Sequence, residues 1–151
     1  MYTTIVVGTD GSDSAATAVR QAAELAKAGG GTLHIVHAYQ PMNMGTLAMS
    51  AGSGGSTIDV ESVNTSIASQ AQSVCRHAGA VADDENVKCE LHAVPGDPCD
   101  SLISVAEQVH ADLIVVGNRG MTGLKRFMLG SVPNKISHHA PCSVLIADTG
   151  H

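Results

Sequence analysis

Three glycines and one serine form the most distinctive pattern in the sequence, Gly117-x2-Gly120-x9-Gly130-Ser131. Gly117 ends an apolar run that is typical of a buried strand, and Ser131 begins a stretch that we expect to be a helix. Glycine lets a ligand approach the backbone closely, and the free N–H groups at a helix N-terminus bind anions. The pattern therefore supplies the parts of a phosphate site. The alternative is that these glycines only end a strand and start a helix.

An aspartate stands at a comparable place near the start of the chain. Asp10 follows the apolar run Thr3–Gly8, and it can either contact a ligand or form a local Asx turn. We favour the ligand role, because ligands of parallel sheets bind at the carboxyl ends of the strands. The glycine spacing differs from the dinucleotide fingerprint and from the P-loop, so neither motif applies. The cations Arg119, Lys125 and Arg126 either neutralise phosphates or form a solvated surface.

The histidines do not predict a metal site. His34 and His37 are three residues apart on an expected strand, so their side chains point to opposite faces. His138 and His139 are adjacent on an expected helix, where their directions differ by about 100°. We interpret these histidines as structural or surface residues. No Ser/His/Asp or Cys/His set suited to nucleophilic catalysis stands out either.

Strand and helix patterns alternate along the chain. Such alternation predicts parallel strands joined by right-handed crossovers, which is an α/β fold with a three-layer, doubly wound sheet of five strands. The expected strands are Thr3–Gly8, Thr32–Ala38, Asn86–Val94, Asp112–Gly117 and Cys142–Ala147, and the expected helices are Ala15–Ala28, Asp59–Ala80, Asp97–His110 and Ser131–His139.

Composition excludes several classes of protein. A chain of 151 residues predicts a single domain spanning 1–151, with a flexible Gly/Ser/Met-rich loop at about 40–58. Aromatic residues make up 2% and the formal net charge is −6, which argues against nucleic-acid binding.

No apolar stretch approaches the roughly 18–20 residues of a membrane span, and no charged leader precedes the first apolar run. The four cysteines form no C-x-x-C pair, so we expect reduced thiols in a cytoplasmic protein.

The Asp10-Gly11-Ser12 turn and the block GNRGMTGLKRFMLGSVPNKISHHAPCSVLIA at 117–147 closely resemble the universal stress protein family. The block contains the complete G-x2-G-x9-G-[ST] pattern of the ATP-binding branch of that family. The resemblance covers essentially the whole chain and implies the strand order 3-2-1-4-5. It also implies that an adenine nucleotide lies between the carboxyl ends of strands one and four.

The resemblance assigns roles to individual residues. Asp10 is expected near the ribose hydroxyls or a phosphate-bound Mg²⁺, and Val36 is expected to border the adenine. Asn118 stands where many relatives carry Ser or Thr, and it can still hydrogen-bond. The backbone groups at 130–132 are expected to donate to the phosphates. The implied nucleotide-binding residues are Gly8, Thr9, Asp10, Val36, Val94, Pro95, Gly96, Gly117, Asn118, Arg119, Gly120, Gly130, Ser131 and Val132.

The function that the resemblance implies is an adenine-nucleotide-binding regulatory protein of the stress response, with ATP and Mg²⁺ as the expected ligands. A sensor that binds cAMP or AMP in the same pocket and a nucleotide-free dimeric scaffold remain open. The sequence shows neither a P-loop lysine nor a base to position water, so any ATP hydrolysis is expected to be slow.

A flavin is disfavoured, because the three aromatic residues offer little surface on which a flavin ring could stack. Family members pair the last strand in a homodimer, which implies a dimer edge at Val144, Leu145 and Ile146.

Overall fold

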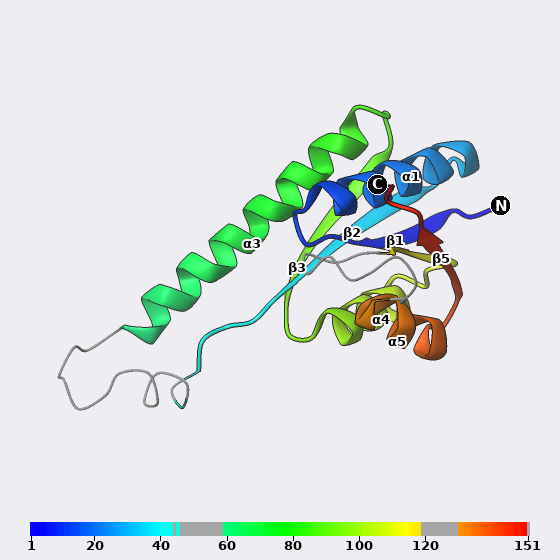
Figure 1. Ribbon diagram of the computed structural model, residues 1–151. Coiled ribbons are helices and arrows are strands. Elements are labelled where there is room, and N and C mark those ends of the chain that lie inside the picture. Colours follow the sequence, from blue (N-terminus) through cyan, green and yellow to red (C-terminus); the bar gives the residue numbers. More distant parts are fainter. Residues whose placement is uncertain (44, 46–58, 119–129, 151) are drawn as a thin grey trace.

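A computed structural model describes residues 1–43, 45, 59–118 and 130–150 of the chain. Strands and helices alternate as the sequence predicts, and most boundaries lie within two residues of the expected ones. Figure 1 shows the elements in chain order. Their bounds are β1 Thr4–Gly8, α1 Asp13–Gly29, β2 Thr32–Tyr39, α3 Val60–Asp83, β3 Lys88–Pro95, α4 Pro98–Gln108, β4 Leu113–Gly117, α5 Ser131–His139 and β5 Ser143–Ala147.

All five strands form one parallel sheet in the order β3-β2-β1-β4-β5, which confirms the predicted topology. Helices α1 and α3 cover one face and α4 and α5 cover the other, giving three layers (Figure 1). From β1 the chain crosses to β2 on one side, and β4 pairs with the other side of β1. The strand order therefore reverses between β1 and β4, which is where ligands of such sheets bind.

Both faces of the central strands are buried in apolar side chains. On β1, Ile5 and Val7 pack beneath α1 and α3, whereas Val6 packs beneath α4 and α5. Helix α1 meets the sheet with alanines at helical spacing, such as Ala18, Ala22 and Ala26, all fully buried. Alanine has no long side chain, so the helix can lie close to the strands. Among the described residues the core is thus built mainly from Ala, Val, Ile and Leu, with Cys75 and Cys99 and without Phe, Tyr or Trp.

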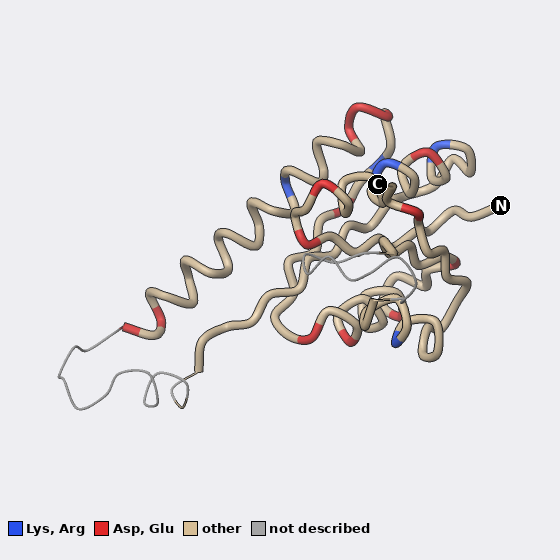
Figure 2. The backbone as a smooth tube through the Cα atoms, in the orientation of Figure 1, with Lys and Arg blue, Asp and Glu red and all other residues tan. Residues whose placement is uncertain are grey.

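The two outer strands differ from the central ones in exposure. The edge strand β3 carries an exposed Leu91, and the side chains Val144, Leu145 and Ile146 of the other edge, β5, are half-buried. Val144 and Ile146 face α5 and Leu145 faces α1, so the backbone edge of β5 is the part left for pairing. Charged residues gather in the helices and turns rather than in the sheet (Figure 2).

Helix α3 extends beyond the sheet at its N-terminal end (Figure 1). Its buried residues come from the second half, from Ala71 to Ala82, although the sequence predicts an apolar face from Val60 onwards. The first turns contact the chain that leaves β2, because the amide of Asn64 hydrogen-bonds both backbone groups of Met42 at 2.7 and 3.0 Å. Most of the predicted loop at 40–58 lies outside the described residues.

The four cysteines, Cys75, Cys89, Cys99 and Cys142, are free thiols. Burial raises the pKa of each thiol, and that of Cys89 rises to about 11. A raised pKa keeps a thiol protonated, and a protonated thiol is a poor nucleophile. None of the described helices is long and apolar enough to cross a membrane.

Candidate functional site

A cavity of about 220 Å³ opens at the carboxyl ends of the strands, where the strand order reverses. Its floor comes from β1, β2 and β4, and its wall on one side comes from the first turns of α4 and α5. The lining is mainly aliphatic, with backbone and a few polar groups at the rim. The lining residues are Gly8, Thr9, Asp10, Ala15, Val36, His37, Ala38, Pro98, Leu102, Val116, Gly117, Val132 and Pro133.

The turn after β1 is held by its own side chains. The Gly11 N–H donates to Oγ1 of Thr9 at 3.2 Å, and the Ser12 N–H donates to Oδ1 of Asp10 at 2.9 Å. Gly11 has φ +80°, a conformation that suits glycine. Ser12 then caps α1 by accepting from the Ala15 N–H. Asp10 therefore forms the Asx turn and also lines the cavity, so the two roles weighed for it are compatible.

A histidine fixes the junction between β1 and β2. The Thr9 N–H donates to the Val36 carbonyl at 2.9 Å, and Nδ1 of His37 lies 2.9 Å from the Thr9 carbonyl. A carbonyl oxygen only accepts, so Nδ1 of His37 must carry the hydrogen. Its Nε2 is then the ring atom that can accept from a ligand. The sequence predicts no ligand role for His37, and its position three residues beyond His34 near a strand end was the available signal.

The start of α5 lies beside the cavity and is open to an anion. Gly130 is the N-cap with φ −57°, and within the described residues no side chain hydrogen-bonds there. Pro133 has no N–H, so the first-turn donors are the amides of Ser131 and Val132. The first turn also contains no acidic side chain. Within the part of the chain that the structure describes, two N–H groups and the positive end of the helix dipole are thus left for a negative ligand.

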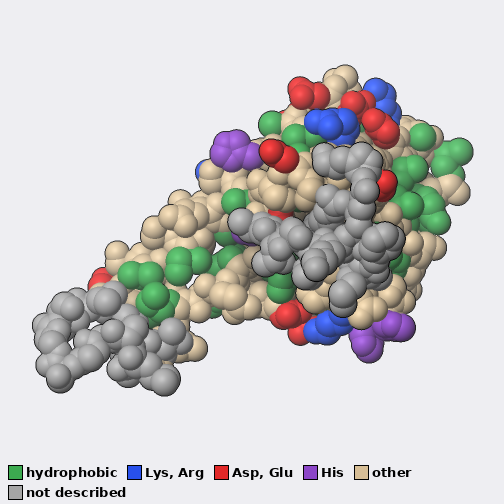
Figure 3. All heavy atoms as spheres, in the orientation of Figure 1, with side chains coloured by type: hydrophobic (Ala, Val, Ile, Leu, Met, Phe, Trp, Pro, Cys, Tyr) green, Lys and Arg blue, Asp and Glu red, His purple; other side chains and the backbone are tan. Residues whose placement is uncertain are grey.

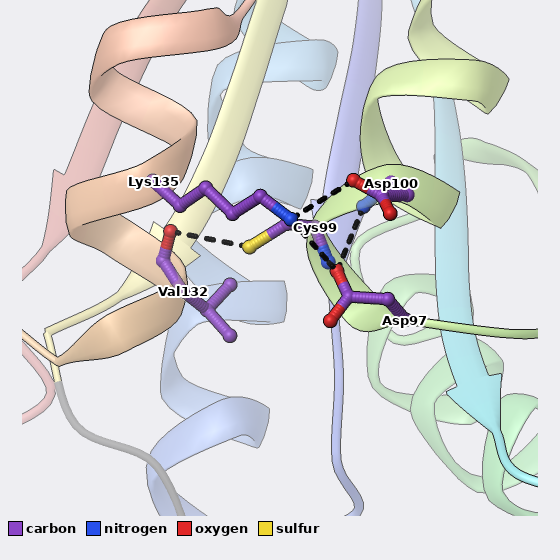
Figure 4. A network of polar contacts seen from close by, with 5 residues as sticks. All are labelled: Asp97, Cys99, Asp100, Val132 and Lys135. Atoms are coloured by element: carbon purple, nitrogen blue, oxygen red, sulfur yellow. Dashed lines mark hydrogen bonds and ion pairs between the residues drawn. The ribbon is translucent and has the colours of Figure 1, made fainter.

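A polar network joins the first turns of α4 and α5 (Figure 4). Asp97 caps α4 by accepting from the Cys99 and Asp100 N–H groups at 2.9 and 3.1 Å. Lys135 of α5 reaches Asp100 at 3.0 Å and Asp97 at 3.5 Å. The hydrogen bond from the Asp100 N–H, aided by Lys135, holds the pKa of Asp97 below its ordinary value. The network sets the distance between the two helix starts that form the cavity wall.

The structure brings together a large part of the predicted site. Gly8, Thr9, Asp10, Val36, Gly117 and Val132 line the cavity, and Gly130 and Ser131 adjoin it. Val94 and Pro95 end β3, Gly96 follows it, and none of the three lines this cavity. Arg119 and Gly120 lie outside the described residues.

The side chain of Asn118 is committed to the C-terminal segment. Its amide nitrogen donates to Asp148, and its oxygen accepts from the Thr149 N–H and hydroxyl at 3.2 and 2.7 Å. Its backbone N–H donates to the Ala147 carbonyl, so the segment after β5 is tied to the end of β4. A nucleotide contact by Asn118 would therefore involve its backbone carbonyl or the second hydrogen of its side-chain amide, or would require these side-chain bonds to break.

Sequence reasoning missed the wall of the cavity. Leu102 lies so close to β1 that a side chain at Gly8 would meet it at 3.1 Å. Leu102 and Val116 follow the helical and strand periodicities of core residues, and no local signal separates wall from core. The remaining lining residues that were not predicted are Ala15, His37, Ala38, Pro98 and Pro133.

The sequence and the fold match known proteins over their full length. The model of the universal stress protein family matches residues 1–148. The chain belongs to the universal stress protein family. The universal stress protein Rv1636 of Mycobacterium tuberculosis is 36% identical over 149 residues, which cover 98% of this chain and 97% of that relative.

Solved universal stress proteins share the arrangement. A universal stress protein in complex with cAMP is 33% identical, with a TM-score of 0.73 and coverage of 99% of this chain and 98% of that chain. The universal stress protein from Archaeoglobus fulgidus in complex with dAMP is 26% identical, with a TM-score of 0.66 and coverage of 96% and 97%. Two relatives of this universal stress protein have thus been solved with adenine nucleotides.

Proposed function

We propose that this universal stress protein binds an adenine nucleotide in the cavity between the ends of β1 and β4. The observation that carries the proposal is the uncapped start of α5, which presents the Ser131 and Val132 amides beside an aliphatic cavity. An apolar pocket accepts a purine, and a helix N-terminus accepts a phosphate. The structures of relatives with cAMP and dAMP support the same class of ligand.

Each part of the nucleotide has a matching part of the cavity. The adenine lies against aliphatic side chains, of which Val36, Ala38 and Leu102 line the cavity. The ribose lies over the ends of β1 and β4, near Asp10 and Gly117. The phosphates lie on the first turn of α5, where Gly130 leaves room for them. The acidic net charge of the chain does not oppose this arrangement, because backbone N–H groups supply the binding.

ATP with Mg²⁺ is the ligand pair that the residues fit first. Magnesium is commonly held by one or two carboxylates together with substrate phosphates and water, and Asp10 is the carboxylate at the rim. One oxygen of Asp10 already accepts from Ser12, which orients the group for a ligand. Bound Mg²⁺ would neutralise phosphate charge. The protein then acts as a regulator, in which bound nucleotide changes the surface that partners or a second copy of the chain contact.

cAMP is the second candidate, and the solved relative in complex with cAMP favours it. A cyclic nucleotide carries one phosphate, which the two amides at the start of α5 can bind without a metal ion. The adenine and ribose of cAMP would contact the same cavity residues as those of ATP. The two candidates therefore differ in one respect that can be measured, which is the dependence of affinity on Mg²⁺.

A homodimer through the edge of β5 completes the proposal. Within the described residues the outer backbone edge of β5 has no neighbouring strand, whereas its apolar side chains pack inward. Pairing two copies of this strand would cover the edge around a two-fold axis. Light scattering measures the mass in solution, and a mass of one chain would contradict the dimer.

Calorimetric titration with ATP and with cAMP, each with and without Mg²⁺, tests the proposed function. For ATP we expect saturable binding of one nucleotide per chain, strengthened by Mg²⁺. Asp10→Asn keeps the oxygen that accepts from Ser12 and removes the charge, so it should reduce the Mg²⁺ effect at least about threefold. The matched control is Asp13→Asn, which removes a charge from the first turn of α1. Tighter binding of cAMP, insensitive to Mg²⁺ and to Asp10→Asn, would replace ATP by cAMP; binding of neither would refute the proposal.

A further inference from the structure

Three side chains with metal-ligand chemistry converge on the outer strands β2 and β3. They are His34 on β2 and Glu90 and His92 on β3. The parallel register places His34 opposite Glu90, and His92 follows two residues later on the same face. Nδ1 of His34 lies 3.1 Å from Nε2 of His92 and 3.6 Å from Oε2 of Glu90.

These separations match the coordination of zinc. Ligand atoms about 2.0–2.1 Å from a tetrahedral Zn²⁺ are about 3.3–3.4 Å from one another. The two measured distances from His34, 3.1 and 3.6 Å, lie on either side of that value. The third pair, between Glu90 and His92, is no farther apart than 4.8 Å. The Glu90 side chain is 49% exposed, so it has the freedom to close the remaining gap.

We propose that His34, Glu90 and His92 form a Zn²⁺ site at the outer edge of the sheet. Two imidazoles and one carboxylate provide three ligands, and the exposed side of Glu90 leaves a fourth position for water. Imidazole ligands favour zinc over magnesium and calcium, which prefer oxygen.

The surroundings of the cluster suit a cation. Burial lowers the pKa of His34 and of His92, and the neutral imidazole is the form of histidine that binds a metal ion. Oε1 of Glu90 lies 3.8 Å from Nζ of Lys88, while its Oε2 turns toward His34. Lys88 thus orients the carboxylate from outside, as outer-shell partners of metal ligands do.

Zinc binding requires the hydrogen between the rings of His34 and His92 to change its position. The contact of 3.1 Å between the two ring nitrogens holds one hydrogen, whichever ring donates it. A zinc ion takes the lone pairs of both nitrogens, so that hydrogen moves to the other nitrogen of the same ring. Binding to the neutral rings therefore changes a tautomer, releases no proton and involves no oxidation.

Titration of the protein, freed of any affinity tag, with Zn²⁺ tests this site. We expect one strong site per chain, with affinity reduced at least about tenfold by Glu90→Gln and by His92→Gln. Both positions are partly exposed, so these variants should fold, and far-ultraviolet circular dichroism checks that they do. The control is His138→Gln with His139→Gln, which removes the adjacent surface histidines and should leave the affinity unchanged. These variants leave the nucleotide site intact, so ATP binding separates failure of this site from failure of the proposed function.

Substitution of Co²⁺ for Zn²⁺ identifies the ligands directly. We expect the visible bands of four-coordinate cobalt without a thiolate-to-metal band. A thiolate band would assign the ion to a cysteine and overturn the proposal. Absence of saturable binding would mean that His34 and His92 form a hydrogen-bonded pair only. Affinity equal to that of the native chain in Glu90→Gln and in His92→Gln would place the ion elsewhere and overturn the proposal.

Discussion

The ends of β1 and β4 and the outer strands β2 and β3 present two kinds of binding chemistry. At the proposed nucleotide site the donors would be backbone amides at the start of α5, beside the glycines Gly117 and Gly130. At the proposed zinc site the ligands would be side chains that the register brings together. A backbone site has no proton to lose and suits a large anion. A histidine and carboxylate cluster suits a compact cation.

The two regions are close neighbours in the sheet. Val36 lines the cavity and is the register partner of His92, and His34 lies two residues before Val36 on the same strand. In Figure 3 charged side chains gather at opposite ends of the visible face, over α1 and α3 and over α4 and α5. Because the two proposed sites are neighbours in the sheet, they differ in the kind of ligand they suit rather than in location. Substitutions that affect only one of them test that difference.

The largest expected effect follows from Gly130→Val. An added Cβ would make ordinary contacts of 3.5 Å with Pro133, and φ is −57°, so the fold should tolerate a side chain there. The side chain would instead occupy the place of a phosphate. Nucleotide affinity, measured by calorimetry, should fall at least about tenfold, which is about 1.4 kcal/mol.

Zinc affinity should not change in Gly130→Val, which provides the internal control. Unchanged nucleotide affinity in the folded variant would mean that Gly130 is only a helix start.

A smaller effect is expected from Ser131→Asp. A carboxylate at the first position of α5 favours the helix itself, because it faces the positive end of the dipole. It also repels a phosphate about 4 Å away by about 1 kcal/mol in water, which corresponds to about fivefold weaker nucleotide binding. Calorimetry and thermal unfolding measure the two effects.

The matched variant for Ser131→Asp is Ser131→Asn, which is similar in size and uncharged, and it should bind nearly as the native chain does. Equal weakening by both variants would point to the hydroxyl rather than to charge.

The smallest effect on binding is expected from Asp97→Ala, which removes the cap of α4 and the partner of Lys135. Loss of the cap should lower the free energy of unfolding by about 1 kcal/mol, and nucleotide affinity should fall less than about threefold. Because the folded state holds the pKa of Asp97 below 3.8, the unfolded chain binds the proton more readily. The stabilisation from the charge is therefore present above pH 3.8 and is lost as the pH falls below it.

Urea unfolding between pH 3 and pH 7 checks the role of Asp97. Asp97→Asn keeps an oxygen for the cap, so it should be more stable than Asp97→Ala and less dependent on pH than the native chain. Identical pH profiles for the native chain and Asp97→Asn would contradict the assigned role.

The sequence predicts the backbone site better than the side-chain site. The strand and helix periodicities predict the sheet, and the glycine pattern predicts the cavity edge, where Gly117 lines the cavity and Gly130 caps α5. Leu102 of the cavity wall looks like any core residue, because its spacing on α4 is that of a buried helix face. The cluster of His34 with Glu90 and His92 depends on the register of β2 and β3, which no local pattern specifies. The spacing along the sequence pairs His34 with His37, which share a strand but not a face.

Nuclear magnetic resonance of the ¹⁵N-labelled chain tests the central claim most directly, because one spectrum reports on both regions. Addition of an adenine nucleotide should shift the amide signals of Ser131 and Val132 more than those of Lys88 and Glu90. Addition of Zn²⁺ should produce the reverse. A nucleotide that binds without moving the Ser131 and Val132 signals would contradict the account.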